Sequence, residues 1–261
     1  MPLIDTHSHL DFDDFAADRA QVLANCKQLG IRQIVVLGVT AARFAALWDL
    51  VEQEPLLYGA LGLHPIFLAK HDDAALEDLD QWLTRLKGHP KLCAIGECGL
   101  DFYLKELDPA YQQQLFDAQV QLAIKHDLPL VLHVRKAHAQ TIETLKHFKP
   151  PKGGIVHAFS GSIEQAREYL KLGFKVGLGG AGTWPQAHKM HRMIKALPDD
   201  AFVLETDSPD MAPAMYAGLR NSPEHLPEIC QALAKIRGMS AEAFAHLSTQ
   251  NACQVFNWPK S

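Results

Sequence analysis

Residues 129–157, PLVLHVRKAHAQTIETLKHFKPPKGGIVH, decide the fold class. An apolar, β-rich run ends at His133, an amphipathic stretch follows over residues 137–148, and a second short apolar run ends at His157. Strands that are apolar on both faces need helices to cover them, and this is the arrangement of a parallel sheet. The segment therefore predicts a strand, a helix and the next parallel strand.

The same period runs along the whole chain. We predict eight strands, at Leu3–His7, Gln33–Val39, Leu57–Leu63, Leu92–Glu97, Pro129–His133, Gly154–His157, Phe174–Leu178 and Phe202–Glu205. Helices are predicted at Asp14–Leu29, Ala41–Glu54, Ala74–Lys87, Ala110–His126, Ala137–Phe148, Ile163–Leu172, Gln186–Leu197, Pro223–Arg237 and Ala241–Val255.

Eight strand-helix units in 261 residues predict an α/β fold, the (β/α)8 TIM barrel, whose usual size is about 250 residues. No linker, low-complexity tract or charge run divides the chain, so we expect a single domain over residues 1–261. A doubly wound open sheet is the alternative. Such a sheet rarely holds eight units in so short a chain, and no Gly-x-Gly-x-x-Gly follows the first predicted strand.

Composition limits the possible functions. The chain has 25 Lys and Arg against 30 Asp and Glu, a formal net charge of −5, with 48% hydrophobic and 21% charged residues. These values are ordinary for a globular protein and exclude a disordered, collagen-like or coiled-coil chain. A mildly acidic chain does not coat a long phosphate backbone, so we exclude a protein that wraps duplexes non-specifically. Nucleic acid remains possible as a locally held substrate.

Targeting signals and cysteines indicate the compartment. The first residues show no signal-peptide pattern, and no apolar run approaches the roughly 18 residues of a membrane span, so we expect a cytoplasmic protein with no membrane partner. The five Cys residues contain no Cys-x-x-Cys pair and are expected to be reduced core thiols. No obligate protein partner is evident.

Residues that bind metals collect where the predicted strands end. His7 and His9 close the first strand, and the period of two places both side chains on one side of it. Chance alone gives about 0.75 His-x-His pairs in a chain with this many His residues, so the pair by itself proves nothing. Four more residues of ligand type lie at strand ends: Glu97, His133, His157 and Asp207. These ends form the catalytic face of a TIM barrel, so we predict a metal site there.

The donor set indicates the ions. Four imidazoles and two carboxylates, without Cys, suit Zn²⁺, Mn²⁺ or Mg²⁺. Six ligands are too many for one open catalytic ion and suffice for two ions that share a carboxylate. Glu97 is the expected bridge, because its strand lies between those of His7 and His133. The absence of a Lys at that strand end argues against a carbamylated lysine bridge.

These motifs resemble the TatD family of metal-dependent deoxyribonucleases, within the amidohydrolase-type barrels. Six segments match in the family's order over nearly the whole chain: Ile4–His9, Gly62–Pro65, Gly96–Asp101, Leu132–Arg135, His157–Gly161 and Glu205–Pro209. The resemblance implies a two-metal phosphodiesterase that acts on DNA ends or short single-stranded DNA, typically as a 3′→5′ exonuclease.

The resemblance also implies roles for individual residues. It places His7, His9 and Asp207 on one ion, His133 and His157 on the other, and Glu97 between both. His64 is implied to contact the substrate. Two departures from the common pattern are Cys98 and the pair Asp210–Met211, and the second lies in the long loop after the eighth strand and bears on substrate preference.

From the residues we expect water activated by two ions to attack phosphorus, with Asp207 as both ligand and general base and Glu97 as the bridging catalytic residue. Two divalent ions and two carboxylates leave a formal charge of about +2, which lets an acidic chain hold a short phosphodiester end. Arg135 is expected to donate to a substrate phosphate, with Lys136 and Arg220 as weaker candidates.

Several residues near the strand ends have two interpretations. Asp5 and Glu205 lie one strand period below His7 and Asp207, so we expect them to accept N–H groups from ligand imidazoles, with a salt bridge as the alternative. Cys98 is expected to point away from the ions. Five aromatic residues can stack on unpaired bases but more often pack loops against helices, and none is assigned to the site: Phe67, Phe102, Tyr103, Phe159 and Trp184.

Two other functions remain open. A metal-dependent ester or amide hydrolase, such as an enzyme that removes an amino acid from misacylated transfer RNA, would use the same site, because activated water attacks a carbonyl carbon as readily as phosphorus. A non-catalytic metal-binding module has no use for Asp207 as a base or for open coordination positions. The sequence does not separate DNA, RNA and acyl esters as substrates.

Overall fold

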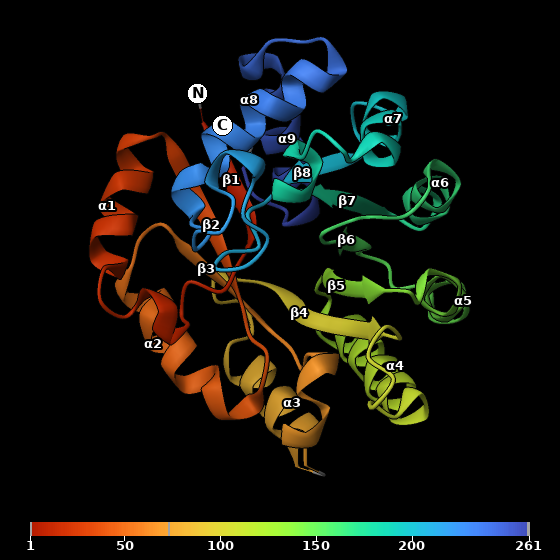
Figure 1. Cartoon of the computed structure of the whole chain (residues 1–261). Helices are drawn as coiled ribbons and strands as arrows, with labels where there is room; N and C mark the ends of the chain where they lie inside the picture. Colours follow the sequence, from red (N-terminus) through yellow and green to blue (C-terminus); the bar gives the residue numbers. More distant parts are fainter. Residues whose placement is uncertain (1, 73, 260–261) are drawn as a thin grey trace.

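The computed structural model describes residues 2–72 and 74–259 and contains one sheet of eight parallel strands in sequential order (Figure 1). The strands are β1 (Leu3–Ser8), β2 (Ile31–Leu37), β3 (Leu57–Leu61), β4 (Leu92–Asp101), β5 (Leu130–Arg135), β6 (Gly154–Val156), β7 (Phe174–Leu178) and β8 (Phe202–Leu204). The two edges meet where Ser8 pairs with Ser208 and the His9 N–H donates to the Ser208 carbonyl at 2.7 Å. This nearly closed sheet is the predicted (β/α)8 barrel.

Helices surround the strands. They are α1 (Arg19–Gln28), α2 (Phe44–Gln53), α3 (Ala75–Arg85), α4 (Pro109–His126), α5 (His138–Phe148), α6 (Ile163–Lys171), α7 (His188–Ala196), α8 (Leu226–Arg237) and α9 (Ala241–Val255). Short 3-10 helices lie at η1 (Asp13–Phe15), η2 (Ala41–Arg43), η3 (Pro65–Lys70), η4 (Gly180–Thr183), η5 (Ala214–Tyr216) and η6 (Pro223–His225). Every predicted strand and helix overlaps an observed one.

Two boundaries differ by four or more residues from the sequence prediction. The helix predicted to begin at Asp14 begins at Arg19, because the Arg19 guanidinium donates to the carbonyls of Leu10, Asp11 and Phe12 and holds this segment in a loop. Strand β4 runs four residues beyond Glu97, since its last residues still pair with β5. The longer β4 adds Asp101 to the functional end of the barrel.

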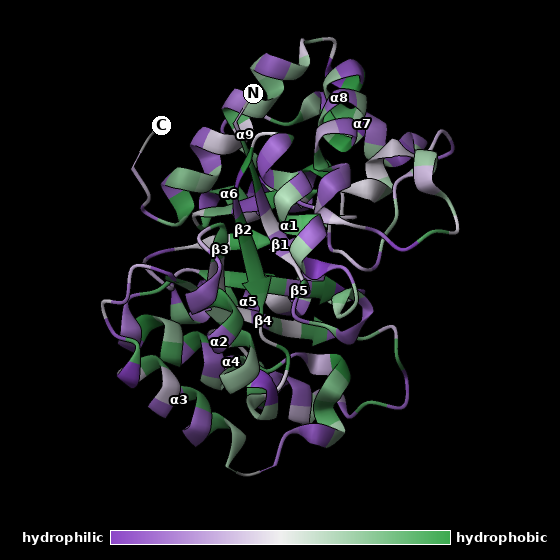
Figure 2. Ribbon diagram, turned by 90° about the vertical axis from the view of Figure 1, so that its left-hand side faces the viewer, coloured by the Kyte–Doolittle hydropathy of each residue, from purple (hydrophilic) through white to green (hydrophobic). Residues whose placement is uncertain are grey.

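The strands are apolar and buried, and the helices alternate polar and apolar positions (Figure 2). Val131 and Ile155 belong to a small apolar cluster and stand two residues before His133 and His157. Side chains two residues apart share one face of a strand, so the barrel's apolar filling and the site residues lie on the same face. All five Cys residues are buried, as expected. Among the described residues no helix is both long and apolar enough to cross a membrane.

Candidate metal centre

The barrel brings the six predicted ligand residues together at one end. His7 lies in β1, Glu97 in β4 and His133 in β5. His9 and His157 directly follow β1 and β6, and Asp207 is the third residue after β8. The strand ladder fixes these positions. The Asp207 N–H donates to the His7 carbonyl at 2.9 Å, and the His157 N–H donates to the Leu132 carbonyl at 3.0 Å.

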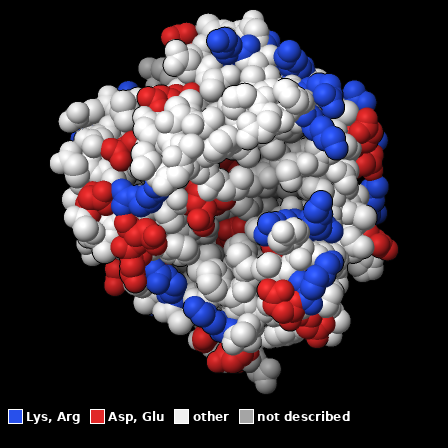
Figure 3. All heavy atoms as spheres, in the orientation of Figure 1, with Lys and Arg blue, Asp and Glu red and all other residues white. Residues whose placement is uncertain are grey.

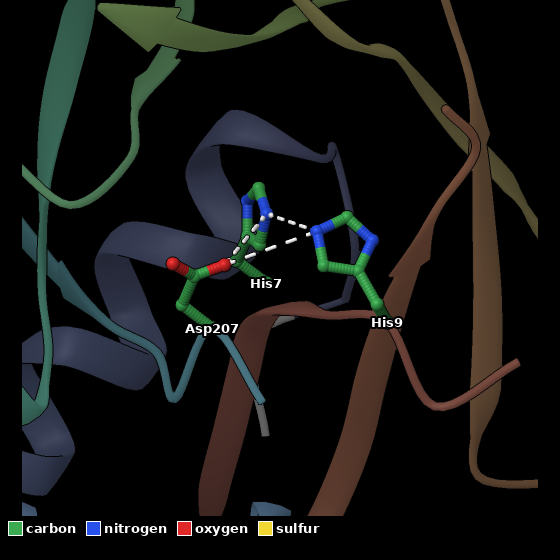
Figure 4. A group of neighbouring side chains, drawn as sticks. All are labelled: His7, His9 and Asp207. Carbon is green, nitrogen blue, oxygen red and sulfur yellow. Dashed lines mark hydrogen bonds and ion pairs between the residues drawn. The ribbon is translucent and has the colours of Figure 1, made fainter. Parts of the chain in front are cut away.

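One donor set lies across the seam between β1 and β8 (Figure 4). Nε2 of His7 and Nε2 of His9 lie 3.3 Å apart. Oδ1 of Asp207 lies 3.4 Å from the first nitrogen and 3.8 Å from the second. Oε2 of Glu97 lies 3.1 and 3.2 Å from the same two nitrogens. Each imidazole nitrogen therefore faces two carboxylate oxygens.

The other oxygen of Glu97 faces a second donor set. Oε1 lies 2.8 Å from Nε2 of His157, 3.1 Å from Nδ1 of His133 and 2.9 Å from Nε2 of His64. The His133 and His157 nitrogens are 3.3 Å apart. Glu97 thus stands between the two sets with one oxygen directed to each.

Hydrogen bonds on the outer side of two rings fix their tautomers. Nδ1 of His9 lies 3.2 Å from the Leu37 carbonyl, and Nε2 of His133 lies 3.0 Å from Oδ2 of Asp101. A carbonyl or carboxylate accepts, so in the neutral rings these nitrogens carry the protons and the opposite nitrogens turn lone pairs toward Glu97. Such partners are typical of imidazoles that bind metals.

In the ring of His64 the nitrogen directed at Glu97 carries the proton, the opposite of the neutral rings of His9 and His133. Its Nδ1 accepts the backbone N–H of Ile66 at 3.0 Å, at the start of η3. In the neutral ring Nε2 therefore carries the proton and donates it to Oε1 of Glu97. His64 offers a proton where His9 and His133 offer lone pairs, which fits a residue that contacts substrate better than a ligand.

The donor atoms fit divalent ions. Lone pairs of His9 and His133 face carboxylate oxygens at 3.1–3.2 Å, and Oε2 of Glu97 is buried without a hydrogen bond to any described residue. A cation between these atoms removes the repulsion. Donors that share a tetrahedral ion at about 2.0–2.1 Å stand about 3.3 Å apart, which matches the spacing of both His pairs.

Burial and neighbouring charges together shift the pKa values of the site residues. Burial raises the pKa of Glu97, but His64, His157 and His7 outweigh it and hold this pKa well below its usual value. Burial raises the pKa of Asp207. Burial also lowers the pKa of His7 far below its ordinary value. The protein thus keeps Glu97 as a carboxylate and His7 as a neutral donor, which are the forms that bind a metal. Burial also lowers the pKa of His9 and of His157, but the carboxylates of Glu97 and Asp207 outweigh it and raise these pKa values to about 9 and about 10, so a metal that binds these two rings displaces protons.

Asp5 and Glu205 lie beneath the site, and neither makes a hydrogen bond to an imidazole in the described part of the chain. Asp5 accepts the backbone N–H groups of His7 and Thr206 at 3.2 and 2.9 Å and the Thr206 hydroxyl at 2.6 Å. It therefore differs from the prediction, because the seam between β1 and β8 offers closer donors. Glu205 accepts the Ala158 N–H at 2.5 Å and lies 3.8 Å from Nδ1 of His157, just outside hydrogen-bond distance.

Asp101 is a site residue that our sequence analysis missed. Its Oδ2 accepts from His133, and its Oδ1 accepts the Tyr103 N–H at 2.9 Å. The predicted fourth strand ends at Glu97, four residues before Asp101. The available signal was its even spacing of four residues from Glu97, which puts both carboxylates on one face of a continuing strand.

A cavity of about 480 Å³ opens onto both donor sets. Its walls include Ile66, Phe67, Met190 and Met211, so the mouth is largely apolar. Arg135 also lines it, with a half-exposed side chain whose guanidinium lies 3.8 Å from the centre of the Tyr103 ring. The predicted phosphate-binding residue is therefore at the mouth and able to donate into it.

The other candidates lie apart from the donor sets. Arg220 pairs with both Asp18 oxygens at 2.9 and 2.7 Å and is not in the site. Phe159 packs against Tyr169, and the Trp184 indole donates to the Ala212 carbonyl at 3.3 Å. Phe102 packs against the core, and the Cys98 thiol faces the Val131 carbonyl. Phe12, which the sequence analysis did not name, stacks on His9 with ring centres 4.8 Å apart.

Comparison with known proteins gives the same assignment. Residues 4–257 match the model of the family described as TatD related DNase. The chain is 40% identical over 256 residues to the uncharacterized metal-dependent hydrolase YjjV of Escherichia coli K12, with 98% of each chain covered. It is 32% identical to the 3′-5′ ssDNA/RNA exonuclease TatD of Erwinia tasmaniensis, over 98% of this chain and all of that one.

Solved structures agree. The crystal structure of YjjV from Escherichia coli superposes with a TM-score of 0.94 at 40% identity over 98% of both chains. A mutant organophosphorus hydrolase from Deinococcus radiodurans, at 17% identity and a TM-score of 0.70 over 97% of this chain and 92% of that one, shares the fold alone. The chain belongs to the TatD family of metal-dependent hydrolases.

Proposed function

We propose that this protein is a deoxyribonuclease that uses two divalent ions to hydrolyse phosphodiester bonds at DNA ends, as a 3′→5′ exonuclease. One observation carries the proposal: each of the two oxygens of Glu97 faces a separate pair of imidazole nitrogens, all within 3.2 Å. A relative named 3′-5′ ssDNA/RNA exonuclease supports the choice of substrate.

In this proposal His7, His9 and Asp207 would hold one ion, His133 and His157 would hold the other, and Glu97, whose two oxygens face the two sets, would be common to both. The nitrogen and oxygen donors suit Zn²⁺, Mn²⁺ or Mg²⁺. Divalent ions bound there supply the Lewis acidity that activates water and offsets negative charge on the phosphate.

The protein's own groups perform the remaining tasks. Oδ1 of Asp207 faces the imidazoles, so Oδ2 is the atom that accepts the proton of the attacking water. The Nε2–H group of His64, which donates to Glu97, can instead donate its hydrogen bond to a phosphate oxygen that enters the cavity. Arg135 presents a forked donor to the same phosphate from the mouth.

The test uses protein stripped by a chelator and reloaded with Mg²⁺, Mn²⁺ or Zn²⁺. Single-stranded DNA labelled at its 5′ end is offered beside an aminoacyl ester, and we expect stepwise shortening of the DNA from the 3′ end. Asp207→Asn should slow it by about 10²–10⁴-fold, whereas the matched change Asp49→Asn on the exposed surface of α2 should not. Ester hydrolysis without DNA cleavage would establish the competing hydrolase function instead. Failure of all three ions to restore either reaction would contradict a catalytic metal centre.

A further inference from the structure

A second cavity, of about 680 Å³, lies beside the catalytic one. Arg135, Ser160 and Met190 line both, so the two form one continuous groove. The second cavity is bounded by the end of β5, the start of α6 and one side of α7. A polymer whose end lies at the donor sets therefore has a path along this side of the barrel mouth.

The lining of this second cavity is basic although the chain is acidic. The lining contains one carboxylate, Glu164, and four cationic side chains, which leaves a formal excess of three positive charges. The cations are Arg135, Lys136, Lys189 and Arg192. Lys189 and Arg192 are three residues apart on α7 and so share one face of the helix.

These cations are available to a ligand. Arg135 approaches Asp101 only at 4.0 Å. Lys136, Lys189 and Arg192 are exposed, and in residues 2–72 and 74–259 none of them has a carboxylate within 4.0 Å. By contrast, cations such as Arg220 and Lys146 are paired with carboxylates at 2.6–2.7 Å.

The opposite side of the mouth carries the other sign. Asp13 and Asp14 begin η1 and are exposed, whereas Asp11 is paired with Arg43 at 3.2 Å. Figure 3 shows carboxylates gathered left of the central hollow, with some Lys and Arg among them, and Lys and Arg on its right, over β5 and α7. A polyanion is therefore attracted more strongly along the basic side than along the acidic one. A duplex that places one strand in the basic groove brings its second strand toward the acidic side, whereas a single strand does not.

The groove also offers a flat surface. The Tyr103 side chain is 52% exposed and carries the Arg135 guanidinium over its ring. A basic track beside an aromatic or guanidinium plane is the combination that binds single strands through phosphates and stacked bases.

We propose that the second cavity is a subsite for a single-stranded nucleic acid, which binds about three phosphates of the strand beyond the bond that is cleaved. Lys136, Lys189 and Arg192 contact those phosphates, and the Arg135–Tyr103 pair stacks on a base. The inference rests on the proposed function, because it takes the strand end to lie at the donor sets. With this subsite, the length of the strand and the cationic residues of α7 determine which substrates bind well.

The test measures binding and cleavage separately. Mg²⁺-loaded protein is titrated into fluorescein-labelled thymidine oligonucleotides of two and eight residues, and binding is followed by fluorescence anisotropy. Phosphorothioate linkages protect the oligonucleotides from cleavage. The eight-residue strand should bind about tenfold more tightly, with a slope of log affinity against log salt of about −2, since each phosphate contact on a single strand contributes about −0.7. In the double variant Lys189→Gln/Arg192→Gln the preference should fall to about two- or threefold and the slope toward about −0.7.

The control Lys27→Gln/Lys235→Gln removes the same charge from exposed positions on α1 and α8 and should leave the preference unchanged. Equal binding of the long strand by wild type and the α7 variant would overturn the subsite, as would equally tight binding of an eight-base-pair duplex. If no DNA is cleaved with any ion but the long strand still depends on Lys189 and Arg192, the proposed function fails and the subsite stands. The reverse result, cleavage independent of strand length, rejects the subsite alone.

Discussion

The two donor sets around Glu97 are held in different ways. The set of His7, His9 and Asp207 is fixed by main-chain bonds of the seam between β1 and β8, such as that from Asp207 to His7 at 2.9 Å. The set of His133 and His157 depends more on side chains, because Asp101 orients His133. The first set is thus built into the closure of the barrel, and the second can be altered by replacing one carboxylate.

Removal of Glu97 should have the largest effect, because this residue is common to both sets. We expect Glu97→Ala to lose both ions and to lower kcat/KM by more than about 10⁴-fold, the upper limit for a single proton-transfer group. Elemental analysis of the purified variant measures the metal content directly. One ion retained at full occupancy would show that Glu97 serves one set only.

Replacement of Asp207 should affect the first set alone. Asp207→Asn keeps the volume of the side chain but loses the base, and we expect kcat to fall by about 10²–10⁴-fold. The content of the ion at His133 and His157 should remain at wild-type level. Loss of both ions in this variant would mean that the two sets do not bind independently.

Replacement of Asp101 tests whether the second set depends on a side chain. Asp101→Asn weakens the bond that orients His133, and loss of such a partner typically costs about 10–100-fold in metal affinity or activity. We expect activity to return when the metal concentration is raised, which a general loss of folding would not permit. A matched change at Asp49 should have no effect.

The difference between the sets also explains which parts of the site the sequence could predict. Strand ends follow from the chain's period, so all six ligand candidates were placed correctly at the barrel mouth. Asp101 was missed because the length of β4 depends on its pairing with β5. The partner of Asp5 depends on the register of β1 against β8, and that register is set only when the barrel closes. Local sequence patterns do not predict contacts between segments that are far apart along the chain.

Replacement of His64 should have the smallest effect on activity. It also distinguishes best between a metal ligand and a residue that contacts the substrate. His64→Asn retains an acceptor near Nδ1 for the Ile66 N–H but has no donor at the Nε2 position, whereas His64→Gln retains that donor. Loss of one hydrogen bond to a charged group costs about tenfold or somewhat more. We therefore expect His64→Asn to lower kcat/KM about tenfold with unchanged metal content, and His64→Gln to restore much of the loss. If the Asn variant loses an ion, the Nδ1 hydrogen bond does not fix the tautomer of the metal-loaded enzyme, and His64 joins His133 and His157 as a ligand.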